Sequence, residues 1–242
     1  MNNLSNFGYN KVTPKEKTKL VQKVFSDVAK DYDLMNDFMS FGAHRIWKKI
    51  FIDIVNPTNT DKIIDIGSGS GDLVLEIQKT GFDGKIDMVD LNQEMLNEGK
   101  KRIKKNNVNF YQQNAEYLSF DDNIYDKYLI SFCLRNITDI NRSLREAYRI
   151  LKPGAQFYCL EFSKPTSFVI SKFYSSYKSK LIPFFGEIFS NNRNAYNYLN
   201  ESIDMFPSQH ELKKKIENAG FQSVKIINLF DGIVSIHTGF KY

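Results

Sequence analysis

The chain of 242 residues has the length of one globular domain. Hydrophobic residues make up 42% of it and charged residues 25%, which excludes a disordered or fibrous protein. The formal net charge of +5 is too small an excess to decide for nucleic acid or for a membrane surface as a partner.

Few features of the sequence indicate the cellular compartment of the protein. Cys133 and Cys159 lie in apolar segments and form no CxxC pair, so two buried thiols in a reducing compartment are expected. The first residues are polar, and no apolar run approaches the ~18 residues that a membrane span needs. We therefore expect a cytoplasmic protein and leave peripheral contact with a membrane open.

The expected elements begin with a loose segment over 1–14, which is rich in Asn. Apolar residues at helical spacing predict a helix over 15–30, and one or two more helices are expected over 38–55. Short apolar strands then alternate with helices, which predicts a parallel sheet covered on both faces. The expected strands are 62–66, 86–90, 108–112, 128–133 and 156–162, and the helices between them are 73–80, 93–105 and 140–151, the last ending at the breaker Lys152-Pro153-Gly154.

The last third of the chain differs in composition. Residues 163–206 are rich in Phe and Tyr and are expected to be helical, with breaks at Pro183 and Gly186. A helix is expected over 211–219, with Gly220 as its C-cap residue. Residues 224–230 and 233–240 flank Asp231-Gly232, a dipeptide typical of a tight hairpin turn. The whole chain thus predicts a mostly parallel sheet of seven strands that ends in an antiparallel hairpin.

A glycine-rich turn is the sharpest motif. Asp65-Ile66-Gly67-Ser68-Gly69-Ser70-Gly71-Asp72 follows the first of these strands and opens a helix, and Gly67, Gly69 and Gly71 allow the backbone to turn tightly against a ligand. Asp72 stands where the dinucleotide fingerprint G-x-G-x-x-G requires its last glycine. The spacing favours a ligand with an amino-acid tail and an adenosine, and an ordinary loop is the alternative.

Polar residues also end the next three strands. Asp90 lies about twenty residues after the turn, where a carboxylate accepts hydrogen bonds from ribose hydroxyls, or else it is a helix N-cap. Asn114 and Ala115 follow the third strand, where an amide can bind an adenine edge, or Asn114 is a turn residue. Ser131 and the pair Arg135-Asn136 at the end of the fourth strand indicate a pocket rather than core.

Taken in order, the motifs resemble the ubiquinone/menaquinone biosynthesis C-methyltransferases, a family within the class I S-adenosylmethionine methyltransferases. The resemblance covers nearly the whole chain, and its signatures here are residues 24–25, 32–37, 40–48, 134–139, 151–154, 160–165, 198–203 and 232–237. The turn departs from the family's usual Ala-Gly-Gly-Thr-Gly, although Ser70 keeps the hydroxyl. Cys133 and Ala155 each stand where the family usually has Gly.

The resemblance implies a Rossmann-like α/β fold and C-methylation of a polyprenylated benzoquinol or demethylmenaquinol ring, with S-adenosylmethionine as methyl donor. We expect one domain, with a helical cap (1–56), a cofactor-binding core (57–162), an aromatic lid (163–210) and a C-terminal helix and hairpin (211–242). The residues expected to contact the cofactor are Asp65, Gly67, Gly69, Ser70, Gly71, Asp90, Asn114, Ala115 and Ser131.

A ring carbon becomes nucleophilic when an adjacent hydroxyl loses its proton, so such a substrate needs a base or a stabilising cation. Arg135 is the first candidate to stabilise the phenolate or polarise a water, and Asn136 to orient the hydroxyl. His44 and Tyr32 are candidates for proton transfer, with helix packing as the alternative for His44. The three histidines are scattered, so no metal is expected.

Two rival functions stay open: a class I methyltransferase with another small-molecule acceptor, and a non-catalytic subunit that binds S-adenosylmethionine in a quinone-synthesis assembly. The base-methylating motif Asn/Asp-Pro-Pro-aromatic is replaced by Cys133-Leu134-Arg135-Asn136, and the lysines are dispersed, so no nucleic-acid partner is expected. A homodimer, a quinone-synthesis complex and bilayer contact through the aromatic helices are further expectations.

Overall fold

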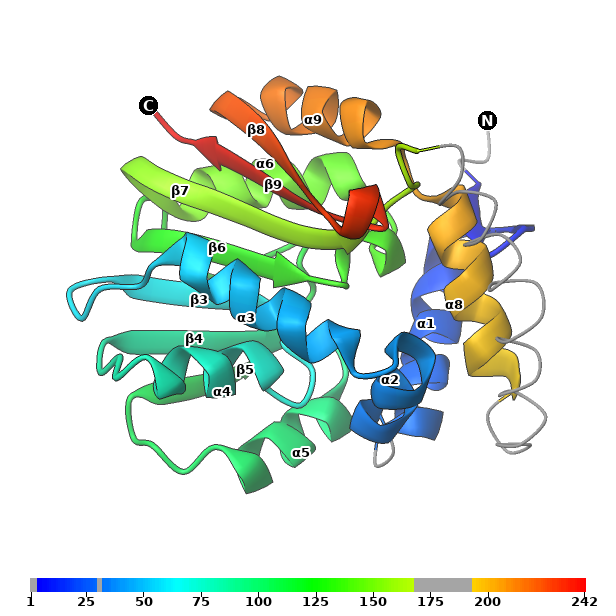
Figure 1. Cartoon of the computed structure of the whole chain (residues 1–242), viewed down its shortest axis with the longest axis horizontal. Coiled ribbons are helices and arrows are strands. Elements are labelled where there is room, and N and C mark those ends of the chain that lie inside the picture. Colours follow the sequence, from blue (N-terminus) through cyan, green and yellow to red (C-terminus); the bar gives the residue numbers. More distant parts are fainter. Residues whose placement is uncertain (1–3, 30–31, 168–192) are drawn as a thin grey trace.

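The computed structural model describes residues 4–29, 32–167 and 193–242. Its centre is a seven-stranded sheet with the order β5-β4-β3-β6-β7-β9-β8, shown in Figure 1. The strands β3 to β7 run parallel, and β9 is antiparallel to both β7 and β8. The sheet is made of β3 (Lys62–Ile66), β4 (Lys85–Asp90), β5 (Val108–Gln112), β6 (Tyr125–Ser131), β7 (Leu151–Phe162), β8 (Gln222–Leu229) and β9 (Val234–Phe240). The predicted sheet with its antiparallel hairpin is thereby confirmed.

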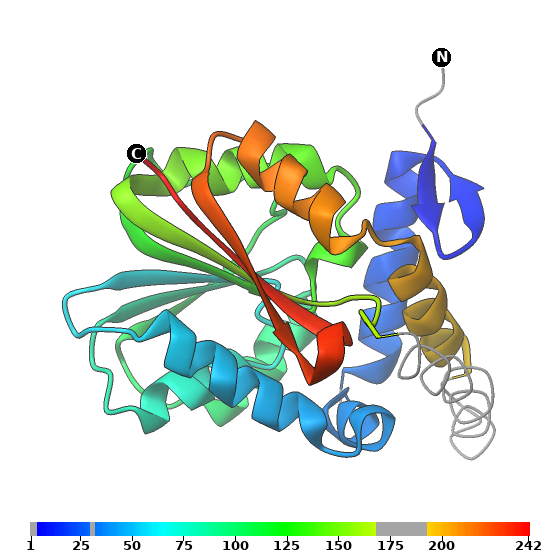
Figure 2. The ribbon, with the colours of Figure 1, turned by 45° about the horizontal axis from the view of Figure 1, so that its top comes forward.

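Helices cover both faces of this sheet, as Figure 2 shows for α3 and α4 on one side and α6 and α9 on the other. The helices are α1 (Pro14–Val28), α2 (Tyr32–Ser40), α3 (Ala43–Val55), α4 (Asp72–Lys79), α5 (Gln93–Arg102), α6 (Ile140–Ile150), α8 (Arg193–Met205) and α9 (Gln209–Asn218). Side chains at their starts set several of these boundaries. Thr13 with Glu16 and Ser208 with Glu211 form capping boxes at α1 and α9.

The apolar run in β3 is explained by burial on both faces. Ile63 packs in a cluster with Phe51 of α3 and Val74 of α4, whereas Ile64 packs with Leu144 of α6 and Ile216 of α9. Successive strand residues point to opposite faces, so a central strand between two helical layers must be apolar at nearly every position. The polar residues that end these strands therefore stand out in the sequence.

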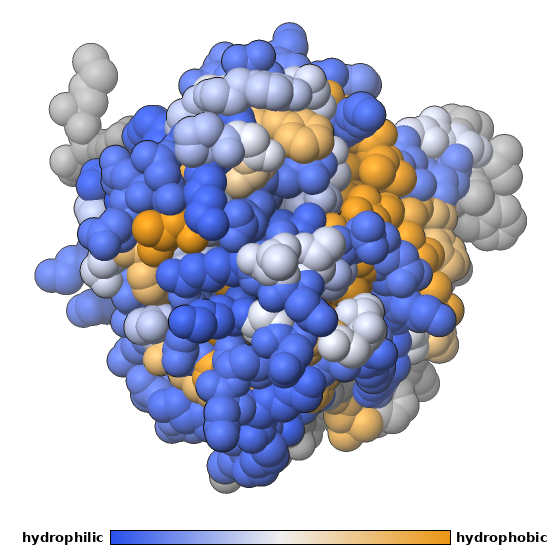
Figure 3. All heavy atoms as spheres, turned by 90° about the vertical axis from the view of Figure 1, so that its left-hand side faces the viewer, coloured by the Kyte–Doolittle hydropathy of each residue, from blue (hydrophilic) through white to orange (hydrophobic). Residues whose placement is uncertain are grey.

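The helices α1, α2 and α8 stand beyond the carboxyl ends of the parallel strands (Figure 1). A two-stranded hairpin, β1 (Ser5–Phe7) and β2 (Asn10–Val12), lies against α1 and α8. The opposite end of the molecule presents a mostly hydrophilic surface (Figure 3). The carboxyl edge of the sheet is thus the edge that is covered, which is where open parallel sheets bind ligands.

Three local predictions were wrong. Residues 5–12 form the β1–β2 hairpin rather than a loose segment. The strand expected over 156–162 begins already at Leu151, where a bulge between the Tyr125 and Lys127 pairings frees Pro153 from the ladder, although the predicted end of the preceding helix at Lys152-Pro153-Gly154 is confirmed, since α6 ends at Ile150. The C-terminal hairpin turns through Phe230–Gly232 and pairs Leu229 with Val234, so its connection is longer than two residues.

The aromatic segment is only partly described. Its helical character is confirmed over 193–205, which is α8. The expected breaks at Pro183 and Gly186 fall outside the described residues.

Candidate active site

Two neighbouring cavities lie at the carboxyl edge of the sheet, one of about 350 Å³ and one of about 100 Å³. Their walls share Tyr32, Gly67, Gly69, Ser131 and Phe132. The site is therefore divided into two compartments that meet at the glycine turn and the end of β6.

The glycine turn has the backbone that the sequence predicts. Gly67, Gly69 and Gly71 adopt φ angles of +64°, +54° and +88°, which disfavour any residue with a side chain. A Cβ at Gly67 would lie 2.1 Å from Sγ of Cys133, and one at Gly71 would lie 2.4 Å from Ile103. The same glycines thus bend the chain and let it pack against the segments that follow β6 and α5.

Asp90 lines the smaller compartment and is tied to the turn. Its carboxylate accepts hydrogen bonds from the backbone N–H groups of Gly69, at 2.9 Å, and Asn92, at 2.8 Å. Burial raises the pKa of Asp90, and these backbone donors oppose the rise. The N-cap alternative for Asp90 is wrong, because the side chain of Asn92 caps α5 by accepting from Glu94 and Met95.

Asn114 and Ala115 line the smaller compartment as well. Oδ1 of Asn114 accepts a hydrogen bond of 2.9 Å from the N–H of Glu116, which is the turn role given above as its alternative. The turn uses the amide oxygen of Asn114 as an acceptor and leaves its NH₂ group to donate to a ligand. Both explanations of Asn114 are thus compatible in one conformation.

Oδ2 of Asp65, which lines the larger compartment, and Oγ of Ser131, where the two compartments meet, are buried and have no partner among the described residues. Asp65 is only 1% exposed, and burial together with the Asp90 carboxylate raises its pKa well above the usual range. Buried polar groups are nearly always hydrogen-bonded, so unpartnered ones beside a cavity indicate a polar ligand. An amino-acid tail with its charged groups fits this donor and acceptor set.

A charged network that the sequence analysis missed closes the glycine turn from outside. Nζ of Lys48 lies 2.5 Å from one oxygen of Asp72, and Arg102 donates to the other oxygen at 2.9 Å. Arg102 also donates to Oγ of Ser70 at 2.7 Å. Asp72, which replaces the last glycine of the dinucleotide fingerprint, was the visible signal of this network.

Arg135 forms a buried ion pair with Glu161. Its Nη1 lies 2.7 Å from Oε1 of Glu161 and donates to the carbonyl of Phe132 at 2.6 Å, while its Nε has no partner among the described residues. Burial raises the pKa of Glu161, and Arg135 opposes the rise. Glu161 was not singled out from the sequence, although it ends β7 beside the site. The guanidinium is therefore a balanced charge whose buried Nε–H is not used by these contacts.

Asn136 is placed differently from Arg135. It lines the smaller compartment, and its Oδ1 accepts a hydrogen bond of 3.0 Å from the hydroxyl of Tyr198 in α8. Arg135 and His44, in contrast, line the larger compartment, and Tyr32 lines both. The structure thus brings together three of the four expected catalytic residues.

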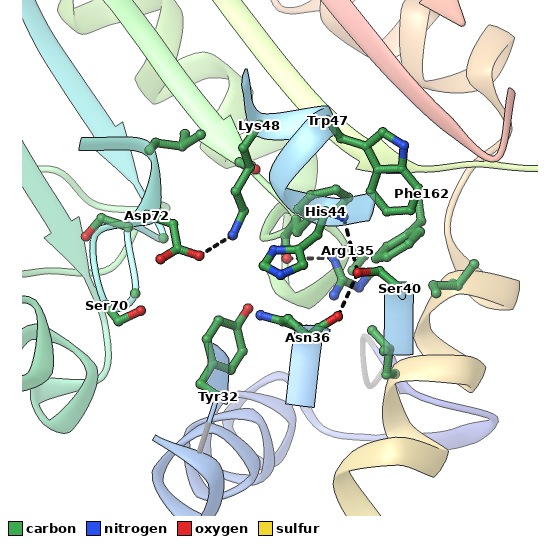
Figure 4. Close-up of a pocket in the computed structure, with 18 of the residues that line it drawn as sticks. Tyr32, Asn36, Ser40, His44, Trp47, Lys48, Ser70, Asp72, Arg135 and Phe162 are labelled. Atoms are coloured by element: carbon green, nitrogen blue, oxygen red, sulfur yellow. Dashed lines mark hydrogen bonds and ion pairs between the residues drawn. The ribbon is translucent and has the colours of Figure 1, made fainter. Parts of the chain in front are cut away.

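The larger compartment has an aromatic wall opposite its polar groups (Figure 4). Trp47 contacts Phe132 and Phe162 at ring-centroid distances of 6.1 and 6.0 Å, and the two Phe rings lie 4.7 Å apart. His44 lies between the side chains of Lys48 and Arg135 in this view. An apolar wall with few polar groups suits a flat, largely apolar ring.

The part of the chain that the structure describes contains no group of three or more His, Cys, Asp or Glu residues placed to hold a metal. Within the same residues, no helix has the length and apolar character needed to cross a membrane.

The sheet order, the glycine turn after β3 and the acid that ends β4 together define a class I S-adenosylmethionine-dependent methyltransferase. A possible histamine N-methyltransferase from Thermotoga maritima has the same fold, with a TM-score of 0.68, 20% identity, and coverage of 92% of this chain and 100% of that one. A family model described as the ubiE/COQ5 methyltransferase family matches residues 12–241, and the chain belongs to this family.

Two relatives show how close this membership is. The ubiquinone/menaquinone biosynthesis C-methyltransferase UbiE of Rickettsia bellii (strain RML369-C) is 47% identical over 247 residues, covering 99% of each chain. The UbiE protein of Vibrio parahaemolyticus is 42% identical over 246 residues, covering 100% of this chain and 95% of its own.

Proposed function

We propose that this protein is an S-adenosylmethionine-dependent C-methyltransferase of ubiquinone and menaquinone biosynthesis, acting on a polyprenylated benzoquinol, a demethylmenaquinol or both. Family membership and the relatives' activity support the reaction. The observation that carries the proposal is the pair of compartments that meet at Ser131, one containing the Asp90 carboxylate and one walled by aromatic rings. A methyl donor and a ring acceptor require such adjoining sites.

The smaller compartment and the glycine turn are proposed to hold the cofactor. The carboxylate of Asp90 accepts from the ribose hydroxyls, and Asn114 with Ala115 faces the adenine. The glycine turn, Ser70 and the unpartnered oxygen of Asp65 surround the methionine end, and Ser131 lies where the two compartments meet. When bound, S-adenosylmethionine supplies an electrophilic methyl group on a sulfonium.

The larger compartment is proposed to hold the quinol ring against Trp47, Phe132 and Phe162. The free Nε–H of Arg135 donates to a ring oxygen and stabilises its negative charge. Glu161 balances the charge of Arg135, which keeps the guanidinium in place without leaving an unpaired cation buried. Asn136 lines the smaller, cofactor-binding compartment. It orients the quinol ring only indirectly, through the loop that it shares with Arg135.

Apolar residues of α8 are proposed to accompany the prenyl tail. Leu199 and Ile203 line the larger compartment, and Phe41 at its rim is 71% exposed. These side chains offer an apolar path from the ring site to the surface. Contact with a bilayer, or with other enzymes of quinone synthesis, would place this rim against the source of the substrate.

Transfer of a labelled methyl group tests the proposal directly. Purified protein is incubated with methyl-labelled S-adenosylmethionine and a chemically reduced demethylated benzoquinol or naphthoquinol. We expect label on a ring carbon of at least one quinol. Label on oxygen would identify another acceptor chemistry, and cofactor binding without transfer would identify a non-catalytic subunit.

A further inference from the structure

A histidine and a carboxylate form a pair on the wall of the larger compartment. His44, in the first turn of α3, is 4% exposed, and its Nε2 lies 2.8 Å from Oδ1 of Asp37 in α2. Arg45 donates to both oxygens of Asp37, with Nε and Nη2 each at 2.7 Å. These hydrogen bonds from Arg45 hold the pKa of Asp37 well below its usual range. Asp37 is therefore an ionised acceptor, and the proton of a neutral His44 belongs on Nε2.

The other ring nitrogen of His44 has no such partner. Nδ1 is buried and unpartnered among the described residues, and His44 lines the larger compartment. Burial, followed by the charge of Lys48, lowers the pKa of His44 below its usual 6.5, while Asp37 and Asp72 oppose this shift. At neutral pH the ring is thus neutral, and Nδ1 carries a lone pair beside the proposed ring site.

Three other polar residues on this wall, Tyr32, Arg135 and Lys48, do not provide a base. Burial raises the pKa of Tyr32 to about 12, so its hydroxyl stays protonated and acts as a donor. Arg135 carries a permanent charge that is paired with Glu161. Lys48 is paired with Asp72. Nδ1 of His44 is the basic atom that these neighbours leave available.

We propose that His44, oriented by Asp37, is the general base that takes the proton from the quinol hydroxyl, an inference that rests on the proposed function. The O–H bond breaks, its electron pair stays on the oxygen and increases electron density at the adjacent ring carbon, and the proton forms an N–H bond at Nδ1. The ionised Asp37 stabilises the resulting imidazolium. After methylation the ring carbon releases its hydrogen to water as a proton, and His44 returns its proton to the oxygen, so one proton is released per turnover.

The variant His44→Gln separates a base from a packing residue. The Gln amide can still donate to Asp37 but cannot accept the substrate proton at neutral pH. We expect kcat/KM for the quinol to fall by ~100-fold or more, the usual contribution of a positioned base, with unchanged affinity for S-adenosylmethionine by calorimetry. The matched control is His210→Gln, at an exposed histidine of α9 that lines neither compartment, and it should keep wild-type kinetics.

The pH dependence gives a second readout. In the wild type, kcat/KM should rise with pH through a pKa below 6.5 and then stay level, because only neutral His44 accepts a proton. This rising limb should be absent from His44→Gln. In Asp37→Asn the limb should move to lower pH, because the carboxylate that raises the pKa of His44 is gone, and kcat should fall as the ring loses its orientation.

Three results would overturn parts of this scheme separately. A wild-type protein that methylates no quinol contradicts the proposed function. An active wild type with His44→Gln close to it in kcat/KM removes His44 from the reaction. If the variant folds poorly, nitrogen NMR of the histidine-labelled wild type decides instead, since the chain has three histidines. A proton on Nδ1 rather than Nε2 of His44 would contradict the inference.

Discussion

Burial of the Asp65 carboxyl group opposes folding. It lies 1% exposed at the end of β3, with Oδ2 unpartnered among the described residues. Burial and the nearby Asp90 raise its pKa above the unfolded value of about 3.9. The protonated acid therefore contributes stability at low pH, and this stability is lost as the pH rises through the folded pKa. At pH 7 the unfolded chain ionises Asp65 freely whereas the folded protein disfavours the ionised form, so Asp65 should cost free energy of folding in the cofactor-free protein.

We accordingly expect Asp65→Asn to raise the free energy of unfolding of the cofactor-free protein at pH 7, by ~1 kcal/mol or more. The gain should shrink as the pH falls and vanish below about pH 4, where Asp65 is protonated in the unfolded chain as well as in the folded protein. Urea unfolding at the two pH values measures this, and Asp121→Asn at an exposed position serves as control. A variant that is destabilised equally at both pH values would show that the carboxylate has a structural partner.

Asp90 should respond differently, because its carboxylate already accepts from Gly69 and Asn92. Asp90→Asn loses an acceptor for one of these backbone groups as well as one for the ribose. We expect the dissociation constant for S-adenosylmethionine to increase roughly tenfold or more, as for a lost hydrogen bond to a charged group. Titration calorimetry checks this, and unchanged affinity would remove Asp90 from the cofactor site.

The residues that could not be predicted from the sequence are those whose role depends on a partner far away in the chain. The turn glycines and Asp90 follow apolar strands, so position alone marks them. Lys48 and Asp72 are 24 residues apart, and Arg135 and Glu161 are 26 apart, so no local pattern connects either pair. His44 was predicted as a candidate for proton transfer, but its pairing with Asp37 through Nε2 depends on how α2 and α3 pack and is not contained in the local sequence pattern.

At the scale of elements, the N-terminal hairpin supports α8. Phe7 stacks on Tyr198 with ring centroids 4.5 Å apart, and the N–H of Tyr9 donates to Glu201 at 3.2 Å. Tyr198 in turn donates to Asn136, which links the hairpin to the loop that carries Arg135. The hairpin escaped prediction because its strands have only three residues each and pack on both α1 and α8, which a local sequence pattern does not show.

We expect Gly8→Ala to loosen this support. Gly8 has a φ of +57°, and an added Cβ would lie 1.9 Å from Oε2 of Glu201. The left-handed backbone costs an Ala ~1 kcal/mol, and the displaced carboxylate leaves the N–H of Tyr9. Because α8 supplies Leu199 and Ile203 to the larger compartment, KM for the quinol should rise while affinity for the cofactor is kept.

Steady-state kinetics with varied quinol measures this effect. Gly154→Ala is the matched control, since Gly154 has a φ of +82° but nothing within 4 Å of an added Cβ. It carries a similar conformational cost far from α8. Equal KM values in the two variants would show that the hairpin does not position α8.

The alternation of strands and helices was predictable because burial on both faces imposes a continuous apolar run on each central strand. Prediction was wrong at places where the regular path of a strand is interrupted. β7 continues through Lys152-Pro153-Gly154 because a bulge leaves Pro153 outside the ladder, a tertiary arrangement that a local breaker signal does not contain. Turn length in the β8–β9 hairpin likewise depends on the pairing of Leu229 with Val234.

At the scale of the molecule, the sheet and the helices beyond it form two unequal parts around the cofactor site. α1 supplies Thr18, Val21, Gln22 and Phe25 to the smaller compartment. Polar bonds link it to the loop after β4: Gln22 donates to the carbonyl of Leu91 at 3.3 Å, and Asn92 donates to Gln22 and Ser26 at 3.1 and 2.9 Å. A helix held to the sheet layer by few bonds opens more readily than a central strand.

Cofactor binding should therefore protect α1 more than the distant edge of the sheet. A ligand at 100 times its dissociation constant stabilises the state that binds it by about 2.7 kcal/mol. If α1 covers the adenosine, its local opening must break the site, so its amides should gain protection from hydrogen exchange up to that amount. The amides of β8 that exchange by local opening should show no change in protection, because β8 lines neither compartment.

The variant Asp90→Asn, at the same cofactor concentration, should show a smaller gain of protection in α1. Unchanged exchange in α1 of the wild type, with calorimetry reporting saturation, would mean that the cofactor binds without this helix as its cover.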